Sequence, residues 1–264
     1  THKIVDYITK KGGYAVALSE GHEGIEEYAN INFEKMPKDT DCIMVLGGDG
    51  TLIRSAAKVM EYHIPLLGIN IGTLGYLCEL EANDVFDAID RLMEEEYFIE
   101  DRIMIEGGKN PKEIVYGLND IVIHRVGDLS VLRMNVYVNG EFLATYDADG
   151  IIVSTPTGST AYSLSAGGPI VAPECGCFLL TPLAPHNFGM RPVVIPDSAT
   201  IELTIHTRHG QAMLSVDNRS YRIGDGEKIT IRRAKEQILL ATPHNISFYE
   251  TLHCKMMWDV DIRN

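Results

Sequence analysis

The segment with the clearest chemical potential is Gly47-Gly48-Asp49-Gly50-Thr51. It lies between an apolar run at 42–46 and apolar residues at helical spacing from Leu52 onward, which predicts a strand, a glycine turn and a helix. Such a turn brings backbone N–H groups and a helix N-terminus close to phosphate oxygens. Asp49 could accept a proton from an attacking hydroxyl or help to hold magnesium. The plainer alternative is that Asp49 only caps the following helix.

This turn matches neither of the two common nucleotide-binding loops. No lysine follows at the position that a Walker loop requires, and the G-x-G-x-x-G dinucleotide fingerprint is absent from the turn. Conventional P-loop and dehydrogenase interpretations are therefore disfavoured.

A second candidate is the pair Asn119-Asp120, which follows a strand-like run at 114–116. An asparagine amide can hydrogen-bond an adenine edge, and a carboxylate can accept hydrogen bonds from a ribose diol. The pair is also common in ordinary turns, and that interpretation stays open on these residues alone.

The third candidate is the run 149–169, in which a strand-like stretch leads into many hydroxyl side chains and glycines. Hydroxyls can donate to phosphate and carbonyl oxygens, and the Tyr162 ring can stack on a base. The alternative is a polar loop, although loops of this length rarely lack both order and function.

The elements around these motifs indicate two kinds of architecture. In the first hundred residues, Ile4, Val5 and Ile8 share a helical face, residues 14–18 and 64–69 are strand-like, and Asn83 can cap a helix over 85–93. This part is expected to be an α/β domain.

From about residue 101 the apolar period changes to two. Residues 132–138 alternate and end at Asn139-Gly140, a strong hairpin signal, and further strand-like runs lie at 151–153, 193–195, 201–205 and 229–231. We expect an all-β sandwich over 101–240, and a last helix from a capping box at Ser247 and Glu250. The helical segment, from about 241 to 264, is expected to join the 1–100 domain.

Composition excludes several function classes. With 23 Lys plus Arg against 37 Asp plus Glu, the net charge of −14 disfavours nucleic acid and anionic membranes as partners. No apolar run approaches the roughly twenty residues of a membrane-spanning helix. Five scattered cysteines and the absence of a leader lead us to expect a cytoplasmic protein. The sheet could lack a first strand that precedes Thr1.

Together these segments resemble the NAD kinases from about residue 42 to the end of the chain. The similar segments are the glycine-aspartate turn 47–51, the G-x-N-x-G-x-L-G-Y-L stretch 68–77, the pair Asn119-Asp120, the run 149–169, and the later elements around Pro182, His186 and Arg191. The turn alone is shared with diacylglycerol kinases and 6-phosphofructokinases, whereas the run 149–169 is far more specific.

The resemblance implies phosphorylation of the adenosine 2′-hydroxyl of NAD to give NADP, with ATP or polyphosphate as donor and a divalent metal, Mg or Mn, as cofactor. It implies Asp49 as general base and Asn119 and Asp120 as ligands of the adenosine part. The other residues that it implies bind NAD or phosphates are Gly48, Gly50, Thr51, Ile53, Arg54, Tyr76, Asp147, Asp149, Thr157, Thr160, Ala161, Tyr162, Ser163, Leu164, Ser165 and Arg219.

The family fold would be an open-sheet α/β domain like that of 6-phosphofructokinase and an all-β sandwich, with the site between them. Homodimers or homotetramers with shared active sites are also implied. The sequence departs from the family at Asp147, where many relatives have arginine, at Arg219, where glutamine is common, and at Asn187, where Ser or Thr is usual. These departures concern the nicotinamide and donor contacts.

Three alternatives remain on the sequence. One is a lipid or sugar-phosphate kinase with the same turn, and another is a catalytically silent NAD-binding sensor. A zinc module of Cys175, Cys177 and His186 matches structural zinc spacing poorly. His63 and His124 fit structural roles better than catalytic ones.

Overall fold

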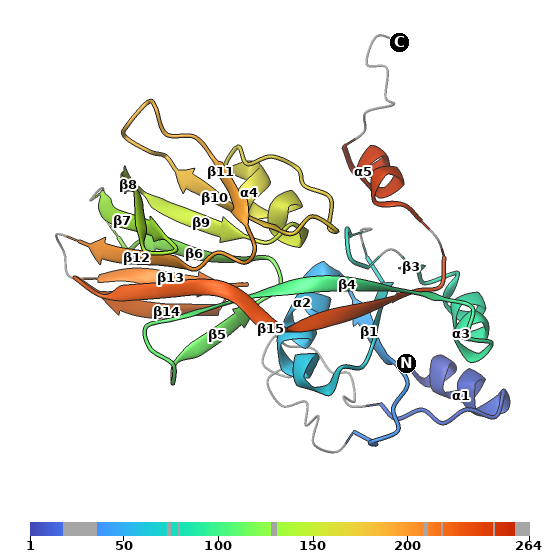
Figure 1. The fold of residues 1–264 in the computed structure, drawn as a ribbon. Coiled ribbons are helices and arrows are strands. Elements are labelled where there is room, and N and C mark those ends of the chain that lie inside the picture. The colour runs from blue at the N-terminus through green and yellow to red at the C-terminus, as the bar shows by residue number, and fades with distance from the viewer. Residues whose placement is uncertain are drawn as a thin grey trace, which may run out of the picture. The chain divides into compact units, whose positions relative to one another are not determined.

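The glycine turn lies between a buried strand and a helix in the computed structural model (Figure 1), which describes residues 1–17, 36–72, 75–78, 80–127, 131–207, 211–217, 219–244 and 246–256. The chain divides into one unit of Thr1–Glu100 with Ile238–Asn264, and a second of Asp101–Gln237. The elements up to the boundary are α1 (His2–Lys10), β1 (Ile43–Gly47), α2 (Asp49–Val59), η3 (Met60–Tyr62), β2 (Leu66–Asn70), β3 (Leu80–Glu81), α3 (Val85–Met93) and β4 (Phe98–Gly108), which crosses it.

A parallel sheet forms the centre of the first unit. β1 and β2 pair in parallel with Gly47 opposite Asn70, and β3 continues the sheet beyond β2. All of β2 is buried, and α2 buries Leu52, Ala56 and Val59, as the helical spacing predicts. Because β1 and β2 end at the same edge, the turn after Gly47 and the segment after Asn70 leave the sheet side by side.

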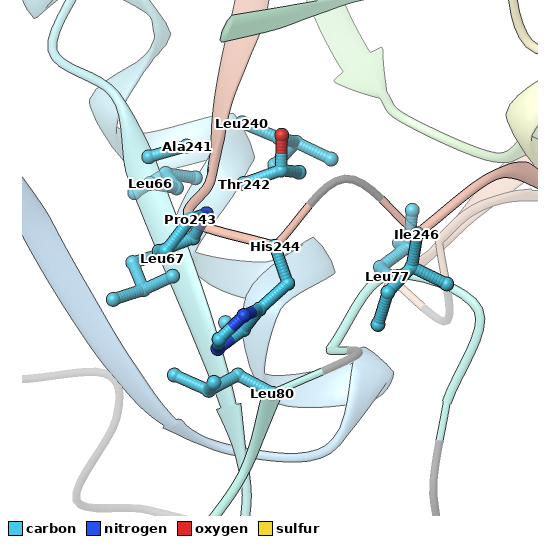
Figure 2. Close-up of a pocket in the computed structure, with 11 residues that line it drawn as sticks. Leu66, Leu67, Leu77, Leu80, Leu240, Ala241, Thr242, Pro243, His244 and Ile246 are labelled. Atoms are coloured by element: carbon cyan, nitrogen blue, oxygen red, sulfur yellow. The ribbon is translucent and has the colours of Figure 1, made fainter. Parts of the chain in front are cut away.

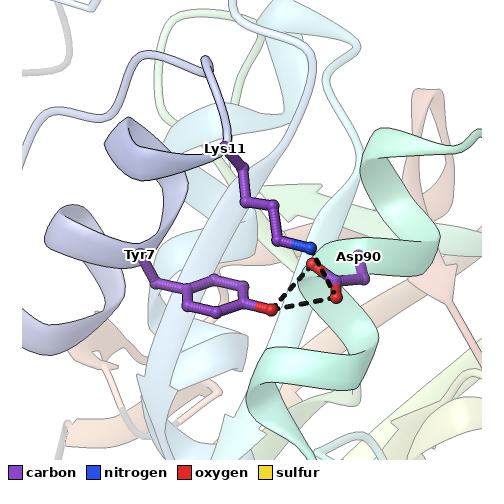
Figure 3. Close-up of polar contacts among 3 residues, drawn as sticks. All are labelled: Tyr7, Lys11 and Asp90. Carbon is purple, nitrogen blue, oxygen red and sulfur yellow. Dashed lines mark hydrogen bonds and ion pairs between the residues drawn. The ribbon is translucent and has the colours of Figure 1, made fainter.

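Helices α1 and α3 are joined by a polar cluster (Figure 3). The Tyr7 hydroxyl donates to both carboxylate oxygens of Asp90 at 3.0 and 2.9 Å, and Lys11 Nζ lies 3.0 Å from Asp90 Oδ2. The Tyr7 ring also packs on Phe86, with centroids 4.7 Å apart. The predicted helix over Ile4 and Ile8 is therefore confirmed, and it is anchored to α3.

Two local predictions in this unit are wrong. Residues 14–17 form no strand, and Tyr14 is 82% exposed, so this apolar run does not enter the sheet; residue 18 lies outside the described residues. Asp84 rather than Asn83 occupies the cap position of α3.

The second unit consists mainly of strands. They are β5 (Ile114–Gly117), β6 (Asp120–Arg125), β7 (Leu132–Val138), β8 (Glu141–Ala148), β9 (Gly150–Ser154), β10 (Cys177–Leu183), β11 (Val193–Pro196), β12 (Ile201–His206), β13 (Gln211–Val216), β14 (Arg219–Gly224) and β15 (Lys228–Thr242), with the short helices η4 (Thr157–Thr160) and α4 (Tyr162–Ser165).

These strands form two antiparallel layers around one apolar core. One layer has the order β11-β10-β9-β6-β13-β14, and the other includes β8-β7-β12-β15. Side chains from both layers, among them Ile121, Met134, Phe178 and Leu203, belong to one buried cluster. The expected α/β first part and β-rich second part are thus confirmed.

Two local signals give the predicted structures. Asn139 and Gly140 both have positive φ, 52° and 80°, as a two-residue hairpin turn between β7 and β8 requires. The capping box is formed: Ser247 N donates to Glu250 Oε2 at 2.8 Å, and Glu250 N donates to Ser247 Oγ at 3.2 Å. It precedes α5 (Phe248–Met256). Across the described residues, no helix combines the length and apolar character needed to cross a membrane.

Candidate active site

Asp49 is held by the backbone of a neighbouring loop. Its Oδ2 accepts a hydrogen bond from Tyr76 N at 2.7 Å, and its Oδ1 accepts from Leu77 N at 3.1 Å and Cys78 N at 3.0 Å. Gly48, not Asp49, occupies the cap position of α2. The interpretation of Asp49 as a helix cap is therefore wrong: its carboxylate is fixed in a defined orientation at the start of the helix.

Glycine is required where the loop approaches this carboxylate. A Cβ atom on Gly75 would lie 1.8 Å from Asp49 Oδ1, far inside van der Waals contact. Gly47 is similarly confined, because its Cβ would lie 2.5 Å from Thr51 Oγ1. Gly75 therefore permits the loop to approach Asp49, and Gly47 permits the tight turn that leads into α2.

The other candidates of this unit surround the same helix start. Gly48, Gly50 and Thr51 belong to the turn, Ile53 is half-buried, and exposed Arg54 donates to Thr51 Oγ1 at 3.4 Å. Burial raises the pKa of Tyr76, and the charge of Asp49 adds to this. Burial likewise raises the pKa of the Cys78 thiol to about 12, so this thiol stays protonated at neutral pH.

In the second unit, the Asn119 turn is residues 118–120: the two-residue link between β5 and β6, followed by Asp120, the first residue of β6. The Asn119 carbonyl accepts from Thr155 N at 2.9 Å, and the Leu118 carbonyl accepts from Thr155 Oγ1 at 2.6 Å. The side-chain Oδ1 of Asn119 is buried, and it has no hydrogen-bond partner among the described residues. A buried amide oxygen without a partner is costly, and a ligand that donates a hydrogen bond would satisfy it.

Asp217 holds this turn from the opposite side. Its carboxylate accepts from Leu118 N at 2.5 Å, Asn119 N at 3.0 Å and Asp120 N at 3.2 Å. Burial raises the pKa of Asp120 to about 7, and the charge of Asp217 contributes to that rise. Burial raises the pKa of Asp217 too, but its three N–H donors and Arg219 oppose the rise. Burial thus favours the protonated form of both carboxyls, and the charge of Asp217 adds to this effect at Asp120.

The hydroxyl-rich run folds into an ordered corner after β9. Ser159 Oγ accepts from Val171 N at 3.0 Å, and Ser163 Oγ lies 2.9 Å from Thr181 Oγ1 of β10. Thr157 and Ser163 are buried, and Thr160, Ala161 and Leu164 are half-buried. Tyr162 and Ser165 are exposed, with nearly half of the Tyr162 surface open to solvent. The run is thus ordered structure rather than a plain polar loop.

Asp147 lies near the end of β8, and Asp149 lies in the link between β8 and β9. Asp147 accepts from Arg133 Nε at 2.8 Å and Nη2 at 3.0 Å, and Asp149 Oδ1 lies 2.9 Å from Arg125 Nε. The Arg133 contact lowers the pKa of Asp147. Arg133 thus lies directly opposite Asp147 in the β7–β8 hairpin.

The register of β6 and β9 shows which candidates lie together. Asp120 is opposite Ser154, whereas His124 is opposite Gly150, and Asp149 is five residues from Ser154, which places Asp120 and Asp149 about 17 Å apart along the strands. The Asn119 turn is therefore next to the start of the hydroxyl-rich corner, and Asp147 and Asp149 are not.

Sequence reasoning missed Asp217 and Gly75 as parts of these arrangements. Arg219 was a predicted site residue, and its guanidinium donates to the Tyr116 carbonyl. The nearby Asp217 makes more of the hydrogen bonds to the Asn119 turn. A signal was present in each case: Asp217 is two residues before Arg219, and Gly75 lies inside the 68–77 stretch.

A small pocket in the first unit lies among other residues (Figure 2). It is lined by Leu66, Leu67, Gly68, Leu77, Leu80, Leu240, Ala241, Thr242, Pro243, His244 and Ile246. Its volume of about 30 Å³ accommodates a few water molecules at most. The pocket is too small to be a nucleotide site.

Comparisons with known proteins agree on one family. Residues 12–97 match the ATP-NAD kinase N-terminal domain, and residues 118–242 match the ATP-NAD kinase C-terminal domain. The NAD kinase of Agathobacter rectalis is 50% identical over 262 residues, which cover 97% of this chain and 92% of the relative. The NAD kinase of Porphyromonas gingivalis is 38% identical, covering 87% of this chain and 80% of the relative.

Solved structures show the same relationship. The NAD kinase of Archaeoglobus fulgidus in complex with ATP has a TM-score of 0.79 at 25% identity, covering 97% of this chain and 94% of that one. Yeast NADH kinase complexed with NADH has a TM-score of 0.78 at 25% identity, covering 86% and 71%. The fold and the sequence together define a kinase. The chain belongs to the ATP-NAD kinase family.

Proposed function

We propose that this protein transfers a phosphoryl group from ATP to the adenosine 2′-hydroxyl of NAD, giving NADP, with Asp49 as the general base. NAD kinase activity follows from the family and from its curated relatives. The observation that supports the role of Asp49 is the orientation of its carboxylate by three backbone N–H groups at the start of α2.

The geometry of Asp49 suits a proton acceptor. Two backbone N–H groups donate to Oδ1 and one donates to Oδ2, and the Cys78 thiol makes a further hydrogen bond with this carboxylate. These contacts fix the carboxylate in one orientation. A carboxylate fixed in this way contributes positioning as well as basicity to phosphoryl transfer.

The remaining candidates divide by unit. In the first, we propose that Gly48, Gly50, Thr51, Ile53, Arg54 and Tyr76 contribute around the adenine and phosphates. In the second, we propose that Asn119 and Asp120 bind the adenosine part, and that Tyr162 stacks on a base. Thr157, the 160–165 stretch, Asp147, Asp149 and Arg219 would supply further contacts to NAD.

A divalent metal, Mg or Mn, is part of the activity that the family implies. No cluster of three or more His, Cys, Asp or Glu side chains in the described parts of the chain could hold a metal ion. Magnesium in nucleotide enzymes is held mainly by substrate phosphates and water. We therefore propose that any metal arrives with the phosphate donor, which is ATP or polyphosphate.

Three further features belong to the proposal. We propose a homodimer or homotetramer with shared active sites, a cytoplasmic location, and a first domain related to that of 6-phosphofructokinase. Light scattering after size-exclusion chromatography would measure the oligomer directly.

The experiment that tests the base is Asp49→Asn, with Asp84→Asn as matched control. Asp84 is an exposed carboxylate in the same unit, so its loss should leave turnover unchanged. Removal of a general base should lower kcat by about 10²- to 10⁴-fold, while calorimetry still detects NAD binding. Wild-type turnover in Asp49→Asn would refute the assignment, and binding without turnover in the wild type would favour the silent sensor.

A further inference from the structure

Asp217 makes most of the hydrogen bonds to the backbone of the Asn119 turn. Besides the three N–H groups bound by the Asp217 carboxylate, Asp217 N donates to the Asp120 carbonyl at 3.3 Å. Thr155 binds the carbonyls of Leu118 and Asn119. Every backbone N–H and carbonyl from residue 118 to 120 therefore has a partner, and Asp217 supplies four of the six.

Arg219 reinforces the same contact from the next strand. Its guanidinium donates to the carbonyl of Tyr116, two residues before the turn. Asp217 has a positive φ of 43°, a conformation that Asp and Asn tolerate better than other non-glycine residues. The backbone at 217 thus turns so that the carboxylate faces three amides of a segment about a hundred positions earlier in the chain.

This arrangement leaves one group of the turn unsatisfied. The Oδ1 atom of Asn119 is buried and lacks a partner within the described residues, while the backbone on either side is fixed. The contacts of Asp217 hold the Cα of Asn119, from which this side chain projects, in a fixed position. Fixing the backbone therefore keeps the amide available to a ligand.

We propose that Asp217, supported by Arg219, is a positioning residue that sets the Asn119-Asp120 turn for binding of the adenosine part of NAD. The inference rests on the proposed function, since it assigns that turn to NAD. Asp217 acts through the turn and contacts no reacting atom in this account. In this role Arg219 stabilises the backbone just before the turn, because its guanidinium donates a hydrogen bond to the Tyr116 carbonyl.

The carboxyl groups of Asp120 and Asp217 also allow the proposal to be tested through the pH dependence of kcat/KM for NAD. The groups described around Asp120 are the Asp217 carboxylate and Arg219 behind it, and the negative charge of Asp217 is one of the two causes that raise the pKa of Asp120. An ionised Asp120 is the better acceptor for ribose hydroxyls. The kcat/KM for NAD should therefore rise with pH through about 7, and removal of the Asp217 charge should move this rise to lower pH.

The test is Asp217→Asn, which keeps the shape and tolerates positive φ but offers one oxygen to three N–H donors. We expect KM for NAD to rise about tenfold or more, KM for ATP to stay within about twofold, and the pH inflection to move to lower pH. Asp197→Asn is the matched control: Asp197 is a similarly buried carboxylate, bound to Arg233 at 2.5 Å. It should lower thermal stability without changing KM for NAD or the inflection.

Each outcome decides the proposal. A folded Asp217→Asn protein with wild-type KM for NAD and an unmoved pH profile would overturn it. If Asp217→Asn does not fold, Arg219→Met takes its place, because Arg219 is exposed; a raised KM for NAD together with a moved pH inflection supports the proposal, and an unchanged KM or an unmoved inflection overturns it. If the wild type makes no NADP, the proposed function fails, and calorimetry of NAD binding to the same variants then judges the positioning role separately.

Discussion

Asp49 and Asn119 are both polar side chains at turns, but their surroundings differ in kind. The Asp49 carboxylate is engaged by three backbone N–H groups, whereas Asn119 Oδ1 is buried without a partner in the described structure. The first side chain contributes to its own loop, and the second is prepared for something outside the protein. Substitutions at the two positions should therefore have opposite effects on stability.

Asn119→Ala should weaken NAD binding and leave the fold intact. Removal of the amide loses a contact worth about 1–3 kcal/mol to the ligand, but it also removes a buried oxygen without a partner, so the melting temperature should stay equal or rise. Calorimetric titration with NAD and thermal unfolding measure the two effects. Asn135→Ala is the control, because the Asn135 amide already accepts from Thr145 at 2.8 Å. An unchanged dissociation constant would remove Asn119 from the site.

Gly75→Ala tests the approach of the loop to Asp49. The new Cβ would overlap Asp49 Oδ1, so the loop must move away and the three N–H contacts must lengthen or break. We expect kcat to fall at least tenfold, because the carboxylate loses its orientation. Gly72→Ala, in the same segment, has 4.0 Å of clearance to the nearest side-chain atom and should stay near wild type. Equal activity of the two variants would contradict the described contact.

At the scale of elements, the packing of α1 on α3 depends on charge. Lys11 and Tyr7 lower the pKa of Asp90 through hydrogen bonds, and Asp90 raises the pKa of Lys11. A lowered acid pKa stabilises the fold above the usual value of about 4, and a raised lysine pKa does so below about 10.5. The cluster should therefore hold α1 across the neutral range and release it in acid, as pH falls through the lowered pKa of Asp90.

Asp90→Asn should loosen α1 at neutral pH. We expect lower hydrogen-exchange protection for the amides of His2–Lys10 near pH 7, with a difference from wild type that shrinks below the pKa of Asp90. Glu94→Gln, an exposed carboxylate just after α3, serves as the control. If the amides of α1 were equally protected in Asp90→Asn and wild type at neutral pH, the ring contact of Tyr7 with Phe86 would be sufficient to hold α1 on α3 without the charged cluster.

Elements were predictable where the signal is local. The helix after the glycine turn, the Asn139-Gly140 hairpin and the Ser247 capping box each depend on a few consecutive residues, and each is present. The run 14–17 has strand-like composition but lies exposed, because composition does not supply a pairing strand. Strands such as β10, β13 and β14 were missed because their burial depends on neighbours distant in sequence.

At the scale of the whole molecule, the site too combines local motifs, which the sequence reveals, with contacts between segments that are distant in the sequence. The motif residues could be selected from the sequence, since each lies in a short characteristic segment. The contacts that fix them could not: Asp217 reaches Leu118 across 99 positions and Tyr76 reaches Asp49 across 27. Only the fold brings those segments together, so the supporting residues emerge from the structure.

The central claim is the transfer of phosphate to the 2′-hydroxyl of NAD, and one assay tests it most directly. Purified wild type is incubated with NAD, magnesium and either ATP or polyphosphate, and the product is read by an NADP-specific dehydrogenase and by phosphorus NMR. We expect NADP with the new phosphate on the adenosine 2′-oxygen, and the comparison of ATP with polyphosphate identifies the class of donor that the protein uses. Absence of product with both donors, or a phosphate at another position, would contradict it.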